Sequence, residues 1–239
     1  MKKLQSEVLT NVRVVFVIPA FNEEAVIFST IQPIVTAGHA VVCVDDASID
    51  ATSEMASKAG ATVVRHLINA GQGASLQTGF DFITQRANLF KGSEFVVTFD
   101  ADGQHSLDDL DRFLEAFRVH SDLDIVLGSR FLSLAFKGSR SKYFLLKTMA
   151  FISRFTLGVK LTDRHNGFRV IKKDKVHFFQ LKSAGYEHAD EFIHIISKNQ
   201  LKYSEVATDI NYTEYSIAKG QPIINGFKIL FDRLISGWK

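Results

Sequence analysis

The chain has 239 residues, of which 46% are hydrophobic, 23% charged and 11% aromatic, with 3 prolines and a formal net charge of +2. This length and apolar content exclude a disordered or fibrous chain and allow a sizeable core. Cys43 is the only cysteine, which excludes a disulfide framework and a cysteine-based zinc site. Neither a spanning helix nor a signal peptide is predicted, because no apolar run is long enough. We therefore expect a chain in a reducing compartment that is soluble or attached to a membrane surface.

Charge is distributed unevenly along the chain. Residues 1–129 carry 9 Lys/Arg against 17 Asp/Glu, a net charge of −8. Residues 130–175 carry 12 Lys/Arg against 2 Asp/Glu, a net charge of +10, and the remaining residues are balanced. An acidic half followed by a basic segment predicts two tasks, namely holding a cation and attracting an anion or an anionic surface.

Short apolar strands alternate with segments of helical length in the first half. The predicted strands are Arg13–Ile18, Ala40–Val44, Thr62–Arg65, Phe95–Phe99 and Asp124–Leu127. The predicted helices are Glu23–Thr36, Ala51–Ala59, Gly73–Gln85 and Leu107–His120, the last opened by a capping box of Ser106 and Asp109. Because the strands are apolar throughout, we expect an α/β fold with a mostly parallel sheet and helices on both faces.

The pattern changes after residue 129. We expect a strand at Phe168–Ile171, helices at Asp174–Leu181 and His188–Asn199, and a strand at Lys202–Tyr212. Two amphipathic helices are predicted over residues 139–157 and 223–238. Because the chain shows no internal repeat and no low-complexity linker, we expect one continuous domain over residues 1–239.

Three of the predicted strands run directly into acidic or amide-rich clusters. The clusters contain Asn22-Glu23-Glu24, Asp45-Asp46 and Asp100-Ala101-Asp102. Helix capping could use Asp50 or Ser106, but it does not explain two aspartates that both precede Ser106. Ligands of open parallel sheets bind at the carboxyl ends of strands, and an Asp-x-Asp pair there suits Mg²⁺ or Mn²⁺ on a diphosphate.

An ordered set of motifs now carries a family resemblance. The motifs are Pro19…Asn22-Glu23, Asp45-Asp46-x-Ser48-x-Asp50-x-Thr52, Asn69-Ala70-Gly71-x-Gly73-Ala74, Asp100-x-Asp102-x-Gln104-His105, Gly128-Ser129-Arg130, Thr162-Asp163-x-x-Asn166-Gly167-Phe168-Arg169 and Tyr212-x-x-Tyr215-Ser216-x-x-Lys219-Gly220-Gln221. Together they resemble the family 2 glycosyltransferases of the GT-A fold, in the dolichyl- or polyprenyl-phosphate mannosyltransferase-like branch. The resemblance extends over nearly the whole chain.

The resemblance implies a role for each matching position. Residues 1–129 would bind the nucleotide sugar and residues 130–239 the acceptor, with Asp45 accepting a hydrogen bond from the base. The implied nucleotide-binding set is Pro19, Ala20, Glu23, Asp45, Asp46, Gly73, Asp100 and Ala101. Asp100, Asp102 and Gln104 would hold Mg²⁺ or Mn²⁺. We interpret Gly71-Gln72-Gly73 as a tight turn that lets a helix N-terminus approach the nucleotide sugar.

The acceptor half carries a second set of implied residues. Asp163, Glu191 and Arg130 are candidate catalytic residues, and Arg130, Arg140 and Lys219 would bind acceptor or phosphate. Transfer to a hydroxyl needs a general base such as Asp163 or Glu191, whereas an ionised lipid phosphate does not. Both carboxylates could instead be structural partners of Arg169 or Lys219.

Basic residues recur at intervals of seven in the segment after residue 130. Arg140, Lys147 and Arg154 would share one helix stripe, opposite bulky apolar residues, which is typical of an interfacial helix. A core helix with a solvated basic face is the alternative. The local charge of +10 favours peripheral attachment to the cytoplasmic face of the membrane.

These observations predict an inverting, metal-dependent glycosyltransferase. It would move a sugar from a UDP- or GDP-sugar to a polyprenyl phosphate or a cell-envelope glycan precursor, with no nucleic-acid partner. A sugar nucleotidyltransferase is the first alternative, although the acidic, glycine-free exit of the first strand argues against it. A non-catalytic nucleotide-sugar-binding subunit is the second.

Overall fold

The computed structural model describes residues 12–132, 159–183, 185 and 187–211. Both predicted amphipathic helices, and with them Arg140, Lys147, Arg154 and Lys219, lie outside the described residues. Within the described ranges, no helix combines the length and the apolar character needed to cross a membrane.

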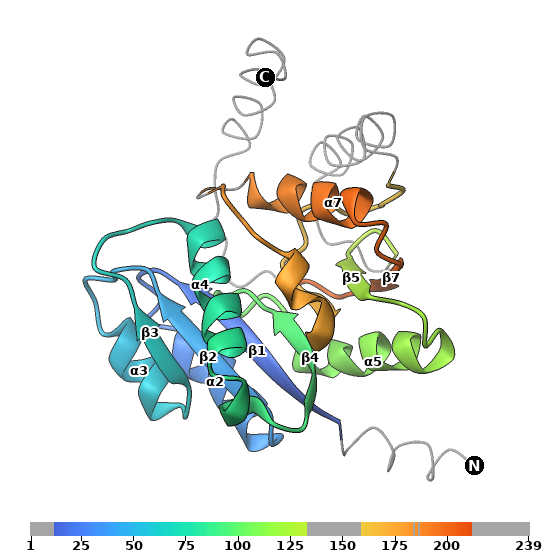
Figure 1. Ribbon diagram of the computed structural model, residues 1–239. Coiled ribbons are helices and arrows are strands. Elements are labelled where there is room, and N and C mark those ends of the chain that lie inside the picture. The colour runs from blue at the N-terminus through green and yellow to red at the C-terminus, as the bar shows by residue number, and fades with distance from the viewer. Residues whose placement is uncertain (1–11, 133–158, 184, 186, 212–239) are drawn as a thin grey trace.

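Seven strands form one sheet (Figure 1). In spatial order they are β3 (Thr62–Arg65), β2 (Ala40–Asp45), β1 (Arg13–Ala20), β4 (Ser93–Thr98), β6 (Arg169–Lys172), β5 (Ile125–Ser129) and β7 (Tyr203–Ala207). The first four strands in this order are parallel, β5 and β7 are parallel to each other, and β6 runs antiparallel between β4 and β5. The predicted mostly parallel α/β sheet is confirmed. Because β6 lies beside β4, the segment around residues 163–169 reaches the carboxyl end of β4.

Helices cover both faces of the sheet. On one face pack α2 (Ile27–Thr36), α3 (Thr52–Lys58) and α5 (Leu110–Val119), and on the other α4 (Gln72–Gln85), α7 (His188–Lys198) and the 3₁₀ helix η3 (Lys173–Phe178). Strand β1 supplies both cores, with Phe16 and Ile18 on the first face and Val15 and Val17 on the second. Alternate side chains of a strand point to opposite faces, so a strand buried on both faces is apolar throughout.

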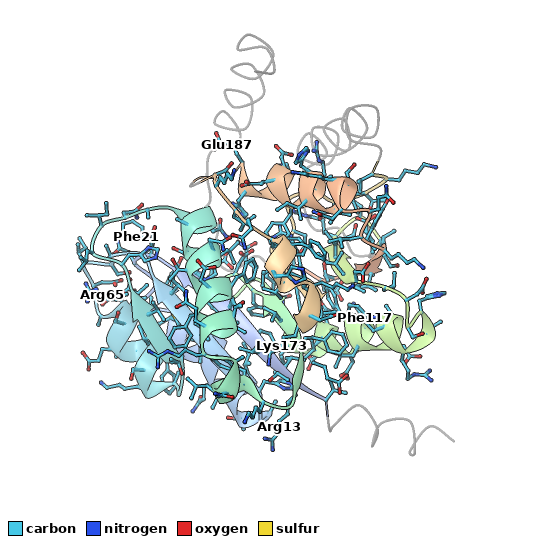
Figure 2. The ribbon with its side chains drawn as sticks, viewed as in Figure 1. Arg13, Phe21, Arg65, Phe117, Lys173 and Glu187 are labelled. Atoms are coloured by element: carbon cyan, nitrogen blue, oxygen red, sulfur yellow. The ribbon has the colours of Figure 1, made fainter. Side chains whose placement is uncertain are left out.

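Helix α2 begins four residues later than predicted. The Glu23 N–H donates to the Thr52 hydroxyl at 2.7 Å and the Glu24 N–H to the Asp50 carboxylate at 3.2 Å. The side chains of Asp50 and Thr52, at the start of α3, therefore satisfy two backbone N–H groups of the segment before α2. This contact joins the loops at the carboxyl ends of β1 and β2. In Figure 2, Phe21 and Arg13 mark the two ends of β1, and the loops lie at the Phe21 end.

Three other predicted features are wrong in detail. The segment after β6 is the short 3₁₀ helix η3 rather than an α-helix, and β7 ends at Ala207 rather than Tyr212. Ser106 caps the 3₁₀ helix η2 (Leu107–Asp109) by accepting from the Asp108 N–H, but no capping box forms. The carboxylate of Asp109 instead accepts from Arg112 at 2.7 Å and from the Asp209 N–H at 2.9 Å. The Asp209 N–H, distant in the chain, thus replaces the Ser106 N–H as the partner of the Asp109 carboxylate.

Candidate active site

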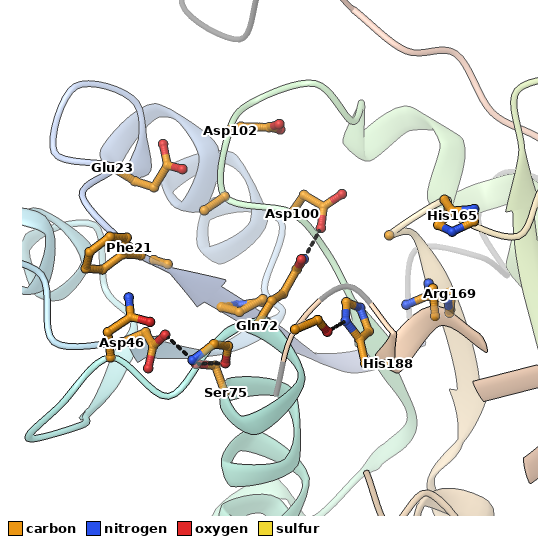
Figure 3. Close-up of a pocket in the computed structure, with 18 residues that line it drawn as sticks. Phe21, Glu23, Asp46, Gln72, Ser75, Asp100, Asp102, His165, Arg169 and His188 are labelled. Atoms are coloured by element: carbon orange, nitrogen blue, oxygen red, sulfur yellow. Dashed lines mark hydrogen bonds between the residues drawn. The ribbon is translucent and has the colours of Figure 1, made fainter. Parts of the chain in front are cut away.

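A cavity of about 460 Å³ opens where β1, β2 and β4 end (Figure 3). Its lining includes four carboxylates that come from these three strand ends, namely Glu23, Asp46, Asp100 and Asp102. The opposite wall comes from the second half of the chain and contains His165, Arg169 and His188. The fold therefore brings together the acidic strand ends as the sequence predicts.

Asp100 is held in place by two side chains. Its Oδ1 accepts from Gln72 Nε2 at 3.1 Å, and its Oδ2 lies 3.0 Å from His105 Nε2. Burial raises the pKa of Asp100, but the hydrogen bond and charge of His105 and the charge of Arg169 outweigh it, so the pKa is lowered overall. The side chain remains 30% exposed, which leaves an ionised carboxylate accessible from the cavity.

Asp102 has the opposite electrostatic environment. Its Oδ1 accepts a hydrogen bond from the Gln104 N–H at 3.1 Å. Burial, followed by the negative charge of Asp100, raises the pKa of Asp102 to about 6. A divalent cation between the two carboxylates would offset their repulsion and favour the ionised form.

The two neighbouring aspartates that follow β2 have different surroundings. Asp46 lines the cavity and accepts from the Ala70 N–H at 2.8 Å and the Gly71 N–H at 2.7 Å, with His66 Nδ1 also at 2.7 Å. Asp45 is fully buried and is not part of the cavity lining. The contact of Asp45 with a base stays a prediction.

The carboxylate of Asp45 is occupied by protein groups. It accepts from the Ser48 N–H at 2.9 Å and from the Ser53 hydroxyl, and Arg65 Nε lies 3.6 Å away. Of the aspartate pair, Asp46 is the one in the cavity lining, although it too is buried and bonded to protein groups.

The remaining members of the predicted nucleotide set divide in the same way. Pro19, Ala20 and Ala101 line the cavity, whereas Gly73 does not. A Cβ on Gly73 would lie 1.9 Å from the Ser183 carbonyl oxygen, so this glycine lets the chain before α7 approach helix α4. The residues of this turn that face the cavity are Gly71, Gln72 and Ser75.

Arg130 and Asp163 form a nearly buried ion pair outside the cavity lining. Arg130 Nε donates to Asp163 Oδ2 at 2.5 Å and Nη2 to Oδ1 at 3.1 Å, and the Arg130 N–H donates to Oδ2 at 3.2 Å. Asp163 is 2% exposed. Asp163 therefore has a structural ion-pair partner, as the alternative to a catalytic role supposed, but that partner is Arg130 and not Arg169.

Glu191 also lies outside the cavity lining. Its carboxylate accepts from the Lys182 and Ser183 N–H groups at 2.9–3.0 Å and so holds the segment before α7. The neighbouring Asp190 pairs with Arg164 Nη2 at 2.8 Å. The catalytic roles assigned to Asp163, Glu191 and Arg130 stay predictions.

Comparison with known proteins identifies the family. A family model described as "Glycosyl transferase family 2" matches residues 15–178. The chain belongs to glycosyl transferase family 2. The resemblance drawn from the motifs is therefore confirmed, and the chain is a glycosyltransferase.

Two relatives illustrate the similarity of this family 2 glycosyltransferase to other members. An uncharacterized protein of Methanocaldococcus jannaschii is 36% identical over 97% of this chain and 96% of the relative. UDP-N-acetylglucosamine–dolichyl-phosphate N-acetylglucosaminyltransferase of Methanococcus voltae is 30% identical over 92% of this chain and 94% of the relative. Its name matches the dolichyl- or polyprenyl-phosphate branch.

The fold is also shared with a solved glycosyltransferase structure. Glucosyl-3-phosphoglycerate synthase from Mycobacterium tuberculosis, in complex with Mg²⁺ and UDP, has a TM-score of 0.63 at 19% identity. The match covers 94% of this chain and 77% of that one. At this level of identity the likeness concerns the fold, and it confirms the predicted GT-A architecture.

The donor atoms in the cavity of this family 2 glycosyltransferase fit a divalent cation that is shared with a substrate. In the described ranges, no three His, Cys, Asp or Glu side chains converge as a complete metal site. Asp100 and Asp102 supply hard oxygen atoms, and Mg²⁺ is commonly held by one or two carboxylates together with substrate phosphates. Gln104, the predicted third ligand, contacts Asp102 through its backbone N–H and is not part of the lining. Its ligand role stays a prediction.

Sequence reasoning missed His165 and His188. Burial lowers the pKa of His165, and burial followed by the charge of Arg169 lowers the pKa of His188 to about 4. His188 Nδ1 lies 2.8 Å from the Gly185 carbonyl oxygen. No local motif marks either histidine, because the tertiary fold alone brings them to the cavity wall. Both are neutral at physiological pH.

His188→Gln is expected to flatten the dependence of stability on pH. The unfolded chain binds a proton at His188 near pH 6.5, but the folded protein does so only near pH 4, so acidification favours unfolding. The contribution of His188 is complete above pH 6.5 and declines towards pH 4, by on the order of 3 kcal/mol. Urea denaturation at pH 4.5, 5.5 and 7 measures it.

His194→Gln is the matched control, since His194 is exposed on the same helix. Its pH profile should follow that of the wild type. Parallel profiles for the His188 variant and the wild type would contradict the assignment of a neutral buried imidazole.

Proposed function

We propose that this family 2 glycosyltransferase moves a sugar from a UDP- or GDP-sugar to a polyprenyl-phosphate lipid, with inversion at the anomeric carbon. The observation that carries the proposal is the convergence of Glu23, Asp46, Asp100 and Asp102 on one cavity at the carboxyl ends of the strands. The acceptor class is that of the Methanococcus voltae relative, whose name specifies dolichyl phosphate.

The donor would lie along the strand ends. Asp46 lines the end of the cavity beside Phe21, where its position suits contact with the nucleoside. Asp100 and Asp102 would hold Mg²⁺ or Mn²⁺ against the diphosphate. Such an ion stabilises the negative charge that develops on the leaving group. Gln72 and His105 fix the orientation of the Asp100 carboxylate for this task.

The transfer itself is a single displacement. An acceptor oxygen forms a bond to the anomeric carbon while the bond to the β-phosphate oxygen breaks, and the nucleoside diphosphate leaves with that electron pair. An acceptor hydroxyl would have to lose its proton to a base, whereas a phosphate monoester is already ionised at neutral pH. Asp163 and Glu191 are occupied by Arg130 and by backbone N–H groups and are absent from the lining, which favours the ionised acceptor.

Attachment to the cytoplasmic membrane surface is part of the same proposal. A polyprenyl phosphate lies in a bilayer, so the enzyme must reach the headgroup layer. The net charge of +10 over residues 130–175 would attract anionic lipid, by about 1 kcal/mol for each basic residue near the surface. High salt should weaken this attraction.

A nucleotide panel tests the donor side of the proposal. UDP or GDP is expected to raise the melting temperature, and Mn²⁺ should increase the shift, because a ligand that binds only the folded state stabilises it. Uridine and guanosine serve as phosphate-free controls. Transfer of labelled sugar to a polyprenyl phosphate, with the corresponding polyprenol as control, tests the acceptor. Equal labelling of phosphate and alcohol, or stabilisation by neither nucleotide, would contradict the proposal.

A further inference from the structure

Arg169 is a buried cation in the wall of the active-site cavity. It is the first residue of β6, is 2% exposed and lines the cavity. Among the residues that the structure describes, its guanidinium has no hydrogen-bond or ion-pair partner. The guanidinium lies over the ring of Phe192, whose centroid is 4.4 Å from Arg169 Cζ.

The environment of Arg169 leaves its charge incompletely compensated. A buried guanidinium without hydrogen bonds is unfavourable, and stacking on an aromatic ring recovers only part of that cost. Burial lowers the pKa of Arg169 to about 10, against the opposing effect of Asp100 and Asp163, so the group stays cationic at neutral pH. Its planar fork of N–H donors is available to an anionic ligand in the cavity.

The other arginines near the cavity are occupied by carboxylates. Arg130 binds Asp163 through two nitrogens, and Arg164 pairs with Asp190. Arg169 is the one Lys or Arg in the cavity lining formed by the described residues. Arg130, one of three residues that the family resemblance assigns to phosphate binding with Arg140 and Lys219, is thus paired with a carboxylate, whereas Arg169 is not.

We propose that Arg169 binds a phosphate group of a substrate within this cavity. The inference rests on the proposed function, in which donor and acceptor both carry phosphate. A guanidinium matches two phosphate oxygens with parallel hydrogen bonds, and a dry site strengthens such a pair. In Figure 3, Asp100 lies between Asp46 on one side and Arg169 with His188 on the other. From its position in the wall, Arg169 would contact either the donor diphosphate held at Asp100 or an acceptor phosphate on the side of the cavity away from Asp46.

Binding experiments on Arg169→Gln and Arg169→Lys test the inference and distinguish the two phosphate sources. The glutamine variant removes the charge, and the lysine variant keeps it but loses the fork. Calorimetry would use UDP and GDP against uridine and guanosine for the donor, and farnesyl phosphate against farnesol for the acceptor. Each titration is run with and without Mg²⁺. Arg86→Gln is the control, because Arg86 is exposed and is not in the lining.

Both Arg169 variants are expected to lose affinity for one phosphate ligand by about tenfold or more, as for a hydrogen-bonded charged group. Loss confined to UDP or GDP assigns the donor diphosphate, and loss confined to farnesyl phosphate assigns the acceptor. Affinity for the phosphate-free compounds should not change. The Arg86 variant should bind like the wild type.

Stability of the unliganded protein separates binding from a structural role. Replacement of an incompletely compensated buried charge should leave the melting temperature unchanged or raise it, whereas a structural arginine would lower it. If the glutamine variant does not fold, the phosphate affinity and melting temperature of the lysine variant decide between binding and a structural role.

Wild-type affinity of the folded variants for all phosphate ligands would overturn the inference, as would an equal loss for the phosphate-free compounds. These measurements need no turnover. A wild-type protein that binds these phosphates but fails to glycosylate polyprenyl phosphate would refute the proposed function alone.

Discussion

Asp102→Ala is expected to abolish sugar transfer, by on the order of a thousandfold or more, without unfolding the protein. The loss follows from the proposed metal site, since a cation on the leaving diphosphate supplies several kcal/mol of transition-state stabilisation. The fold should survive because, among the described residues, this carboxylate accepts a single hydrogen bond, from the Gln104 N–H. Burial, followed by the charge of Asp100, raises its pKa to about 6, so the ionised form is unfavourable without a cation.

The measurement combines turnover with metal-dependent nucleotide binding. In Asp102→Ala, Mn²⁺ should no longer strengthen the binding of UDP or GDP. Above pH 6 the metal-free variant should melt no lower than the wild type, because one of two repelling charges is gone. Asp108→Ala, an exposed aspartate outside the lining, should keep normal activity. Undiminished turnover by Asp102→Ala would remove the metal assignment.

Gly167→Ala is expected to weaken metal-dependent nucleotide binding, as Asp102→Ala does, although it adds only a single methyl group. A Cβ at this position would lie 2.1 Å from Asp100 Oδ2 and 2.4 Å from Oδ1, so the carboxylate must move. The obstructing atoms are the end of a side chain rather than backbone, so the strain falls on the orientation of Asp100 and not on the fold. We expect metal-dependent nucleotide binding to fall at least tenfold, with a near-normal melting temperature.

Gly73→Ala provides the contrast for this prediction. Its Cβ would lie 1.9 Å from the Ser183 carbonyl oxygen, so the backbone before α7 must shift while Asp100 keeps its partners. Calorimetry with UDP or GDP and Mn²⁺ should therefore separate the two variants. Equal metal-dependent affinity in Gly167→Ala and the wild type would show that Asp100 tolerates displacement, contrary to its role as a ligand.

The central strands could be predicted closely from local pattern. Strands that are buried on both faces are continuous apolar runs, and β1 between its two cores shows this directly. The ends of elements were predicted less well. Helix α2 begins at Ile27, after a segment in which Thr52 and Asp50, distant in the chain, accept hydrogen bonds from the Glu23 and Glu24 N–H groups. Such capping by a neighbouring loop leaves no periodic signal.

The acidic side of the site was also predictable, since carboxylates after parallel strands converge at one edge of the sheet. The sequence did not predict which aspartate of the pair Asp45 and Asp46 lines the cavity. Successive residues of an extended chain point in opposite directions, so Asp45 contacts Ser48 and Ser53 while Asp46, which is also buried, lines the cavity. The sequence does not state which direction leads to the ligand.

The sequence by itself determined the family, the α/β sheet and the acidic strand ends, because each depends on residue order and local periodicity. Only the tertiary structure decided which charges are paired. It joins Arg130 to Asp163, 33 residues away, and brings Gly167 against Asp100. It also leaves Arg169 in the wall without a carboxylate partner among the described residues. Charge pairing depends on distances of a few ångströms between segments remote in the chain, and the packing of β6 between β4 and β5 sets those distances.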